Sequence, residues 1–217
     1  MKFFIDSGNL RDIESLVSLG IIDGVTTNPS LMAKESGDPR AHIKKICQMV
    51  KGPVSAEVVA TDVAGMLSEG RELAKIDEHV VVKVPFTRAG VEACKTLASE
   101  GIRVNVTLIF TAAQALIAAK VGATYVSPFV GRLDDIASDG MGLIEAIVEI
   151  FANYGFKTEI LVASTRGPMH IVEAARMGAH ICTCPPAVIE ACFNHPLTDI
   201  GLAKFLKDWE KAQAAKA

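Results

Sequence analysis

One lysine lies in the middle of an otherwise apolar segment. Residues 80–85 read VVVKVP, and Lys83 is the only charged residue among them. A continuous run of valines is typical of a parallel strand buried on both faces. Burial disfavours the charged ammonium form, and a neutral lysine amine attacks carbonyl carbon to give a Schiff base. Lys83 is therefore a candidate nucleophile, although a strand-end lysine can also pack its stem and extend its ammonium group into water.

Other polar residues occur late in strand-like segments, with Asp6 after KFFI and Glu57 within VSAEVV. Successive side chains of a strand point to opposite faces, so each of these residues faces away from its apolar neighbours. In a parallel barrel the active site forms at the C-terminal ends of the strands. Carboxylates brought there could transfer protons and pair with Lys83, because buried charges are costly unless they are paired. The other polar residues with this placement are Thr26, Asn28, Asn105, Thr107, Ser127 and Ser164.

Each of these residues also has a purely structural interpretation. Asp6 could cap the helix that follows it. Glu57 could serve only as the ion-pair partner of Lys83, and Asn28 or Asn105 could be hydrogen-bonded core amides. The same placement recurs in seven strand-like segments, and this agreement favours a shared site.

Two arginines follow strand-like segments as well. Arg132 comes after SPFVG, and Arg166 lies in ASTRGP just before a helix expected to begin at Pro168. Arginine binds phosphate through a bidentate guanidinium fork, and the loop after the seventh strand of a barrel is a frequent phosphate site. Arg166 beside Ser164 is therefore the stronger phosphate candidate, whereas Arg132 could equally be a surface arginine.

Eight short β-type segments alternate with helical segments, which indicates βα units and a parallel sheet. The β-type segments are residues 2–6, 24–28, 54–59, 80–85, 103–108, 124–129, 159–164 and 180–184. An open doubly wound sheet would place a G-x-G-x-x-G turn after the first strand, but the turn here reads DSGN. We therefore predict an α/β protein with a single (β/α)8 barrel, or TIM barrel, spanning residues 1–217.

A final helix is expected beyond the eighth unit, at about residues 197–214. Its apolar residues Leu202, Phe205, Leu206 and Trp209 recur at helical spacing. A stripe of this kind most often packs on its own domain. The alternative is a helix that contacts a neighbouring subunit.

Composition excludes several classes of partner. The 217 residues carry a net charge of −3 and no basic block, which argues against binding nucleic acid or an anionic membrane. No apolar stretch approaches the roughly 20 residues that a membrane span needs. Asp6 interrupts the N-terminal segment too early for a secretory signal. Five cysteines, an odd number in a domain of this size, indicate reduced thiols and a cytoplasmic protein.

His180, Cys182 and Cys184 alternate along one segment and could suggest a metal site. Zinc sites normally combine two separated clusters of ligands, and the sequence offers no second cluster with suitable spacing. Buried cysteines more often pack as small hydrophobic residues, so no metal is expected. His170, in the helix after Arg166, has no evident base partner in the sequence.

The segments around these candidates resemble a known family, the small transaldolases, which form a subgroup of the transaldolase family. The matching segments are FFIDSGN (3–9), GVTTNPSLMAKE (24–35), VSAEVVATD (54–62), VVVKVPFT (80–87), VNVTLIF (104–110), ATYVSPFVGRLDD (123–135) and LVASTRGPMH (161–170). The similarity continues through HPLTDIGLAKFLKDW (195–209) and covers essentially the whole chain. It implies a (β/α)8 barrel, in agreement with the pattern of segments.

The resemblance implies a role for each candidate. Lys83 matches the lysine that forms the Schiff base, and Asp6 matches the acid/base that removes the proton of the C4 hydroxyl. Glu57 matches the carboxylate that acts through a water, which Thr107 helps to hold. Asn28, Asn105 and Ser127 fall where the family binds the hydroxyls of the dihydroxyacetone unit, Thr26 and Phe129 fall in the same substrate region, and Arg132, Ser164 and Arg166 fall on the phosphate site.

The implied reaction transfers a three-carbon dihydroxyacetone unit from a ketose phosphate to an aldose phosphate in the non-oxidative pentose phosphate pathway. The donor would be sedoheptulose 7-phosphate or fructose 6-phosphate, and the acceptor glyceraldehyde 3-phosphate or erythrose 4-phosphate. The iminium is the electron sink, so no metal or organic cofactor is expected. Members of the subgroup form rings of five that pair into decamers, and the resemblance therefore implies a homo-oligomer, either a pentamer or a decamer.

The sister group, the fructose-6-phosphate aldolases, is the main alternative. These enzymes share the lysine and the barrel but release free dihydroxyacetone. They usually carry glutamine in place of Glu57 and tyrosine in place of Phe129, and a tyrosine hydroxyl could assist water in releasing the three-carbon unit. Both residues of this chain favour transaldolase. A non-enzymatic barrel is disfavoured because the polar residues at the strand ends are all present.

Overall fold

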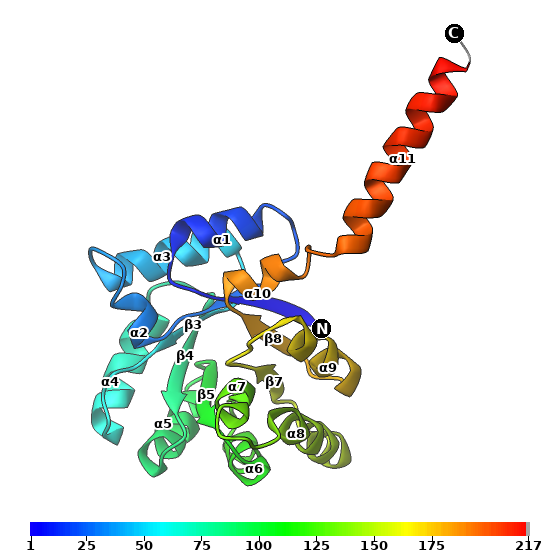
Figure 1. Ribbon diagram of the computed structural model, residues 1–217. Helices are drawn as coiled ribbons and strands as arrows, with labels where there is room; N and C mark the ends of the chain where they lie inside the picture. Colours follow the sequence, from blue (N-terminus) through cyan, green and yellow to red (C-terminus); the bar gives the residue numbers. More distant parts are fainter. Residues whose placement is uncertain (216–217) are drawn as a thin grey trace.

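Eight parallel strands close into a barrel in the computed structural model, which describes residues 1–215. The strands follow one another in sequence order, the eighth pairs with the first, and helices surround them (Figure 1). The predicted α/β barrel with an additional C-terminal helix is confirmed.

The strands are β1 (Lys2–Asp6), β2 (Gly24–Thr26), β3 (Val54–Glu57), β4 (Val80–Pro85), β5 (Val104–Ile109), β6 (Tyr125–Pro128), β7 (Glu159–Val162) and β8 (Ile181–Cys184). The helices are α1 (Leu10–Val17), α2 (Pro29–Met32), α3 (Pro39–Val50), α4 (Val63–Ala74), α5 (Arg88–Ser99), α6 (Ala112–Lys120), α7 (Val130–Asp134), α8 (Gly140–Tyr154), α9 (Pro168–Met177), α10 (Pro186–Ala191) and α11 (Pro196–Ala214).

Several strands end earlier than the sequence pattern predicts, because the chain leaves the sheet there to form the loops of the barrel mouth. Asn28 does not extend β2 but caps α2, and its side-chain oxygen accepts a hydrogen bond from the Leu31 N–H at 2.9 Å. Ser164 lies beyond β7 with a φ of 61°, a left-handed conformation that a strand does not contain.

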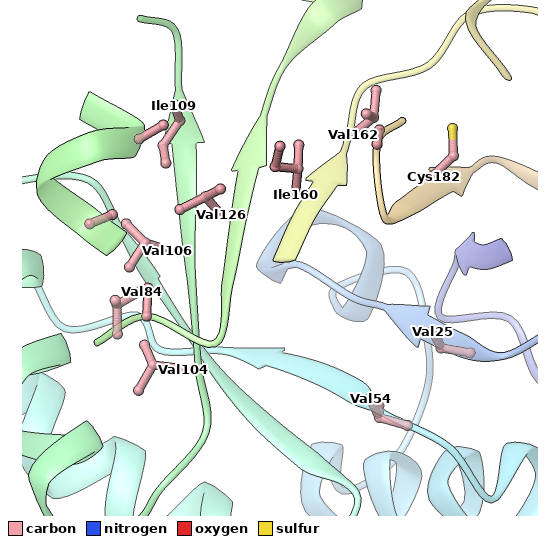
Figure 2. Packing of buried hydrophobic residues seen from close by; sticks show 14 of the residues in the cluster. Val25, Val54, Val84, Val104, Val106, Ile109, Val126, Ile160, Val162 and Cys182 are labelled. Atoms are coloured by element: carbon pink, nitrogen blue, oxygen red, sulfur yellow. The ribbon is translucent and has the colours of Figure 1, made fainter. Parts of the chain in front are cut away.

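Strand residues that point outward form the larger core, against the helices. The members labelled in Figure 2 are Val25, Val54, Val84, Val104, Val106, Ile109, Val126, Ile160, Val162 and Cys182. All of them except Cys182 are β-branched, and such side chains suit strands that are buried on both faces, which is why the strand segments read as apolar runs.

A smaller apolar cluster fills the interior of the barrel. It contains Phe4, Val81, Tyr125, Leu161 and Ile181. The rings of Phe4 and Tyr125 meet edge to face with their centroids 6.3 Å apart. The same strand faces carry, two residues later, the polar side chains of Asp6, Lys83, Ser127 and Thr183. The apolar cluster therefore closes the barrel beneath a polar layer at its C-terminal end.

The last helix, α11, extends away from the barrel (Figure 1). Phe205 is 72% exposed and Trp209 64%, and none of the residues of this helix is buried. Packing on its own barrel, which is the more common arrangement for an apolar stripe, is therefore the wrong interpretation. Within residues 1–215, neither α11 nor any other helix is long and apolar enough to cross a membrane.

Candidate active site

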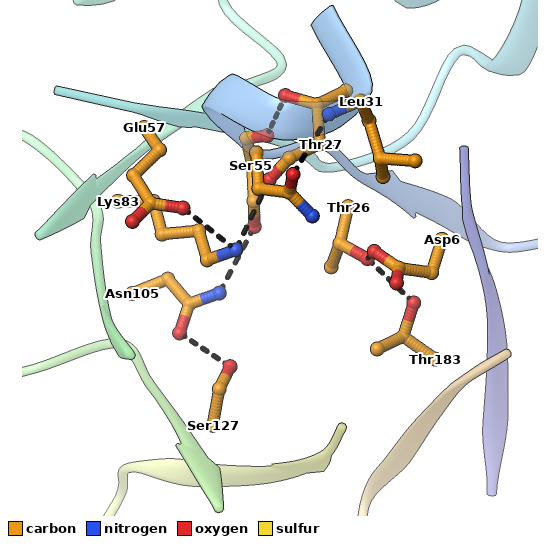
Figure 3. A network of polar contacts seen from close by, with 11 residues as sticks. Asp6, Thr26, Thr27, Leu31, Ser55, Glu57, Lys83, Asn105, Ser127 and Thr183 are labelled. Carbon is orange, nitrogen blue, oxygen red and sulfur yellow. Dashed lines mark hydrogen bonds and ion pairs between the residues drawn. The ribbon is translucent and has the colours of Figure 1, made fainter. Parts of the chain in front are cut away.

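Lys83 lies inside the barrel, on β4, and only 4% of the residue is exposed. Its ammonium group donates to the carbonyl oxygen of Thr27 at 3.0 Å and forms an ion pair with Oε2 of Glu57 at 3.0 Å (Figure 3). Register explains the pair, because Glu57 on β3 is the direct neighbour of Lys83 in the parallel ladder. The nitrogen is thus held within the barrel, and the interpretation of Lys83 as a lysine that extends into solvent is wrong.

Asp6 ends β1 and is oriented by hydroxyl groups. The Thr26 hydroxyl donates to Oδ1 of Asp6 at 2.7 Å, and Oγ1 of Thr183 lies 2.6 Å from Oγ1 of Thr26 (Figure 3). The cap of α1 is Asn9, whose side chain accepts two backbone N–H groups of the first helical turn. Asp6 is therefore not the cap of that helix, and its carboxylate lies at the barrel mouth instead.

Two adjoining cavities open on Lys83. The first has a volume of about 290 Å3 and is lined by Asp6, Thr26, Asn28, Lys83, Ser127, Phe129, Arg132, Ala163, Ser164, Thr165, Arg166, Thr183 and Pro185. The second has a volume of about 310 Å3 and is lined by Asn28, Pro29, Ser30, Glu57, Lys83, Thr107, Leu108, Phe129 and Arg132. The amine therefore faces a cavity that contains Asp6 and a second cavity that contains Glu57.

A chain of hydrogen bonds fixes the amide of Asn105, which is the neighbour of Lys83 on β5. The Ser127 hydroxyl donates to Oδ1 of Asn105 at 2.8 Å, and the Asn105 amide donates to Oγ of Ser55 at 3.1 Å (Figure 3). Asn105 is fully buried and lines neither cavity, whereas Ser127 lines the cavity of Asp6. The Asn105 side chain therefore orients the Ser127 hydroxyl without reaching either cavity itself.

The hydroxyl of Thr107 is buried and has no hydrogen-bond partner within residues 1–215. It lines the same cavity as Glu57 and Lys83. A buried hydroxyl without a partner costs free energy, so this oxygen favours a polar molecule bound in the cavity between Thr107 and Glu57.

Two guanidinium groups line the cavity of Asp6. Cζ of Arg132 lies 4.9 Å from the ring centroid of Phe129, in a cation–π contact. Arg166 forms an exposed ion pair with Asp135, with 2.7 Å between Nη2 and Oδ2. With Lys83, three cationic side chains line a cavity that contains one carboxylate, so the site suits an anionic ligand.

The cysteines of β8 face the helices and not the cavities. The sulfur atoms of Cys182 and Cys184 lie 3.6 Å apart in the outer core. The hydrogen bond between them and their burial raise the pKa of Cys182, and burial raises the pKa of Cys47 and of Cys94 to about 12. Within residues 1–215, no group of three or more His, Cys, Asp or Glu residues could hold a metal ion.

Thr183 and Thr165 also line the cavity of Asp6 but were absent from the predicted set. The Thr165 hydroxyl donates to the carbonyl oxygen of Thr183 at 3.0 Å. Strand parity could have located Thr183, because it shares a face with Ile181 and lies opposite Cys182. Thr165 lies in a loop, where no periodicity applies.

The sequence matches the family model for transaldolase/fructose-6-phosphate aldolase over residues 3–216. A probable transaldolase of Kosmotoga olearia is 58% identical over 211 residues, which is 97% of each chain. A probable transaldolase of Methanococcus maripaludis is 59% identical over 210 residues, covering 97% of this chain and 98% of the relative. A probable transaldolase of Nitrosopumilus maritimus is 58% identical over 215 residues, covering 99% and 97%. The chain therefore belongs to the transaldolase/fructose-6-phosphate aldolase family.

Proposed function

We propose that this protein is a transaldolase that transfers a dihydroxyacetone unit from a ketose phosphate to an aldose phosphate. The observation that carries the proposal is the position of Lys83, which is buried with Glu57 at 3.0 Å on one side and the cavity of Asp6 on the other (Figure 3). Membership of the family and the names of its relatives support it.

Lys83 attacks the ketone carbon of the donor sugar as a free amine. Glu57 accepts the ammonium proton across the 3.0 Å ion pair, so the contact that stabilises the buried charge also provides the route to the nucleophile. The addition gives a carbinolamine, and loss of its hydroxyl group as water gives the iminium. A water held between Glu57 and Thr107 relays the protons of these two steps.

Asp6 then accepts the proton of the C4 hydroxyl as the bond between C3 and C4 breaks. The electrons of that bond move into the iminium, which becomes an enamine, and an aldose phosphate leaves. The enamine attacks the aldehyde of the acceptor, Asp6 returns the proton to the new hydroxyl, and water releases the ketose product from Lys83. The bond from Thr26 keeps the carboxylate of Asp6 in one orientation during these transfers.

The remaining residues of the cavity hold the substrate. Arg132 and Arg166 bind the phosphate group together with Ser164, because bidentate guanidinium groups match phosphate oxygens. Ser127 and Asn28 bind hydroxyls of the three-carbon unit, and Asn105 acts through Ser127, whose hydroxyl it orients. Sedoheptulose 7-phosphate and fructose 6-phosphate fit this division as donors, and glyceraldehyde 3-phosphate and erythrose 4-phosphate fit it as acceptors.

The competing activity within the family is aldol cleavage that releases free dihydroxyacetone. Glu57 and Phe129 favour transfer, since Phe129 offers no hydroxyl to assist water at the enamine. With fructose 6-phosphate as donor, we expect transfer to erythrose 4-phosphate to be at least about tenfold faster than release of dihydroxyacetone without an acceptor, a barrier difference of about 1.4 kcal/mol. Release of dihydroxyacetone at the rate of transfer would support the aldolase instead.

We also propose that the protein is a homo-oligomer, a pentamer or a decamer, held by α11. Leu202, Leu206 and Trp209 are more than half exposed on this helix, and apolar stripes of this length are seldom left in water. A second copy of the chain is the natural occupant, because every copy carries the same unpaired helix.

Light scattering tests the role of α11 in assembly. We expect the unaltered chain to have the mass of a pentamer or decamer, and the double replacement Phe205→Glu and Trp209→Glu to shift it toward the monomer. Tyr154→Glu, which changes an equally exposed aromatic residue on α8, should leave the mass unchanged. A monomeric unaltered chain would contradict this part of the proposal.

A cytoplasmic location is the last part of the proposal. All five cysteines are free thiols, and four of them are buried. Exported domains usually oxidise their cysteines to disulfides, whereas the cytosol keeps thiols reduced.

A further inference from the structure

A largely buried histidine connects the loop of Arg166 to α7. His170 lies in α9, and its side chain is 15% exposed. Nδ1 accepts the backbone N–H of Arg166 at 3.1 Å, and Nε2 lies 2.9 Å from Oδ2 of Asp134. A backbone N–H can only donate, so Nδ1 carries no proton, and the ring proton lies on Nε2, the nitrogen next to the Asp134 carboxylate. The two neighbours therefore select one tautomer of the ring.

Asp134 uses both of its carboxylate oxygens. Oδ2 lies 2.9 Å from Nε2 of His170, and Oδ1 accepts the backbone N–H of Gly140 at 3.1 Å, at the start of α8. One carboxylate at the end of α7 thus joins the beginning of α8 to α9. These three helices lie on the same side of the barrel (Figure 1).

The other end of α7 lies directly on the loop that follows β7. The N–H groups of Val130 and Gly131 donate to the carbonyl oxygens of Ala163 and Ser164, both at 3.1 Å. A Cβ atom at Gly131 would collide with the Ser164 carbonyl oxygen, so only glycine permits this approach. The loop is therefore fastened to the first turn of α7 by its backbone, and to the last turn by His170 and Asp134.

We propose that His170 and Asp134 are a positioning pair that holds Arg166 and Arg132 at the separation required for the phosphate group of the substrate. Arg132 belongs to α7 and Arg166 to the loop, so the contacts at the two ends of α7 set the distance between their backbones. His170 lines neither cavity and acts only through the loop. The inference rests on the proposed role of the two arginines as phosphate ligands.

Asp134→Asn is the sharpest test because asparagine has the same size and shape as aspartate and differs only in replacing one carboxylate oxygen with an NH2 group. The amide has one carbonyl oxygen for two donors, the Gly140 N–H and the Nε2–H of His170. If that oxygen stays with Gly140, the amide NH2 group faces Nε2 and favours the tautomer with its proton on Nδ1, which no longer accepts from Arg166. We expect the Kd of inorganic phosphate and the KM of fructose 6-phosphate to rise about five- to tenfold. The KM of unphosphorylated fructose and the rate of Lys83 adduct formation with it should change less than about twofold.

Further variants separate positioning from a general loss of structure. His170→Ala should match Asp134→Asn, and the double variant should add little, since both act through one contact chain. His170→Asn, whose side-chain oxygen can take the place of Nδ1, should recover part of the phosphate affinity. Arg166→Ala gives the full loss for comparison, and Glu149→Gln, an exposed carboxylate on α8, is the matched control that should behave as the unaltered protein.

The phosphate titration tests the positioning role, and the transfer assay tests the proposed function, so each can be contradicted without the other. Equal losses for phosphorylated and unphosphorylated sugars, an unchanged phosphate affinity in Asp134→Asn, or an unaltered protein that binds no phosphate would each overturn the positioning role. Phosphate binding that depends on Asp134 in a protein that transfers no three-carbon unit would overturn the proposed function and leave the positioning role standing.

Discussion

Replacing Lys83 by methionine is expected to lower kcat for sugar transfer by about four orders of magnitude or more, because the nucleophile of the covalent pathway is removed. Methionine fills a similar volume on β4. Glu57 loses its ion-pair partner but lines an open cavity where water can solvate its carboxylate, so the barrel should remain folded. Steady-state transfer from fructose 6-phosphate to erythrose 4-phosphate gives the rate, and circular dichroism checks the fold.

A second lysine variant provides the control for this experiment. Lys95 is exposed on α5, away from the cavities, and Lys95→Met should retain the activity of the unaltered chain. Substantial turnover in a folded Lys83→Met protein would contradict the assignment of the nucleophile.

Replacing Asp6 by asparagine should block the reaction one step later, after the Schiff base has formed. The side-chain oxygen of asparagine can still accept the hydrogen bond from Thr26, so the local geometry is retained while the base is lost. We expect kcat to fall by about 10²- to 10⁴-fold, the usual contribution of a positioned general base.

Trapping with borohydride distinguishes this block from a general loss of activity. With fructose 6-phosphate, Asp6→Asn should accumulate an adduct on Lys83 that contains the whole donor sugar, because the bond between C3 and C4 stays intact. A three-carbon adduct formed at the rate of the unaltered protein would show that another group removes the C4 proton.

Much of the barrel could be predicted because its signals are local. Apolar runs of strand length alternate with helical segments, and strand parity alone places Asp6, Lys83 and Ser127 on the inner face. The arrangement of two cavities around Lys83 was harder to predict from the sequence, because it depends on the register that places Glu57 beside Lys83. Register is the alignment of two neighbouring strands, and it cannot be read from the sequence of either strand alone.

The ion pair with Glu57 bears on how Lys83 becomes a free amine. Burial alone was expected to favour the neutral amine, but Lys83 loses water and gains the Glu57 carboxylate at 3.0 Å. We infer that proton transfer within the pair, and not burial alone, frees the amine for attack.

The remaining differences arise from contacts between distant segments. His170 had no evident partner in the sequence because Asp134 is brought to it only by the packing of α7 against the loop after β7. The orientation of α11 could not be predicted from its stripe, because the periodicity gives a helix an apolar face and does not specify what covers it.

Every step of the proposed reaction depends on a covalent intermediate between Lys83 and the ketose phosphate. Borohydride treatment of the unaltered protein with fructose 6-phosphate, followed by peptide mass spectrometry, detects this intermediate. We expect a reduced three-carbon unit on the peptide that contains Lys83. An unmodified Lys83, or an adduct on a different lysine, would contradict it.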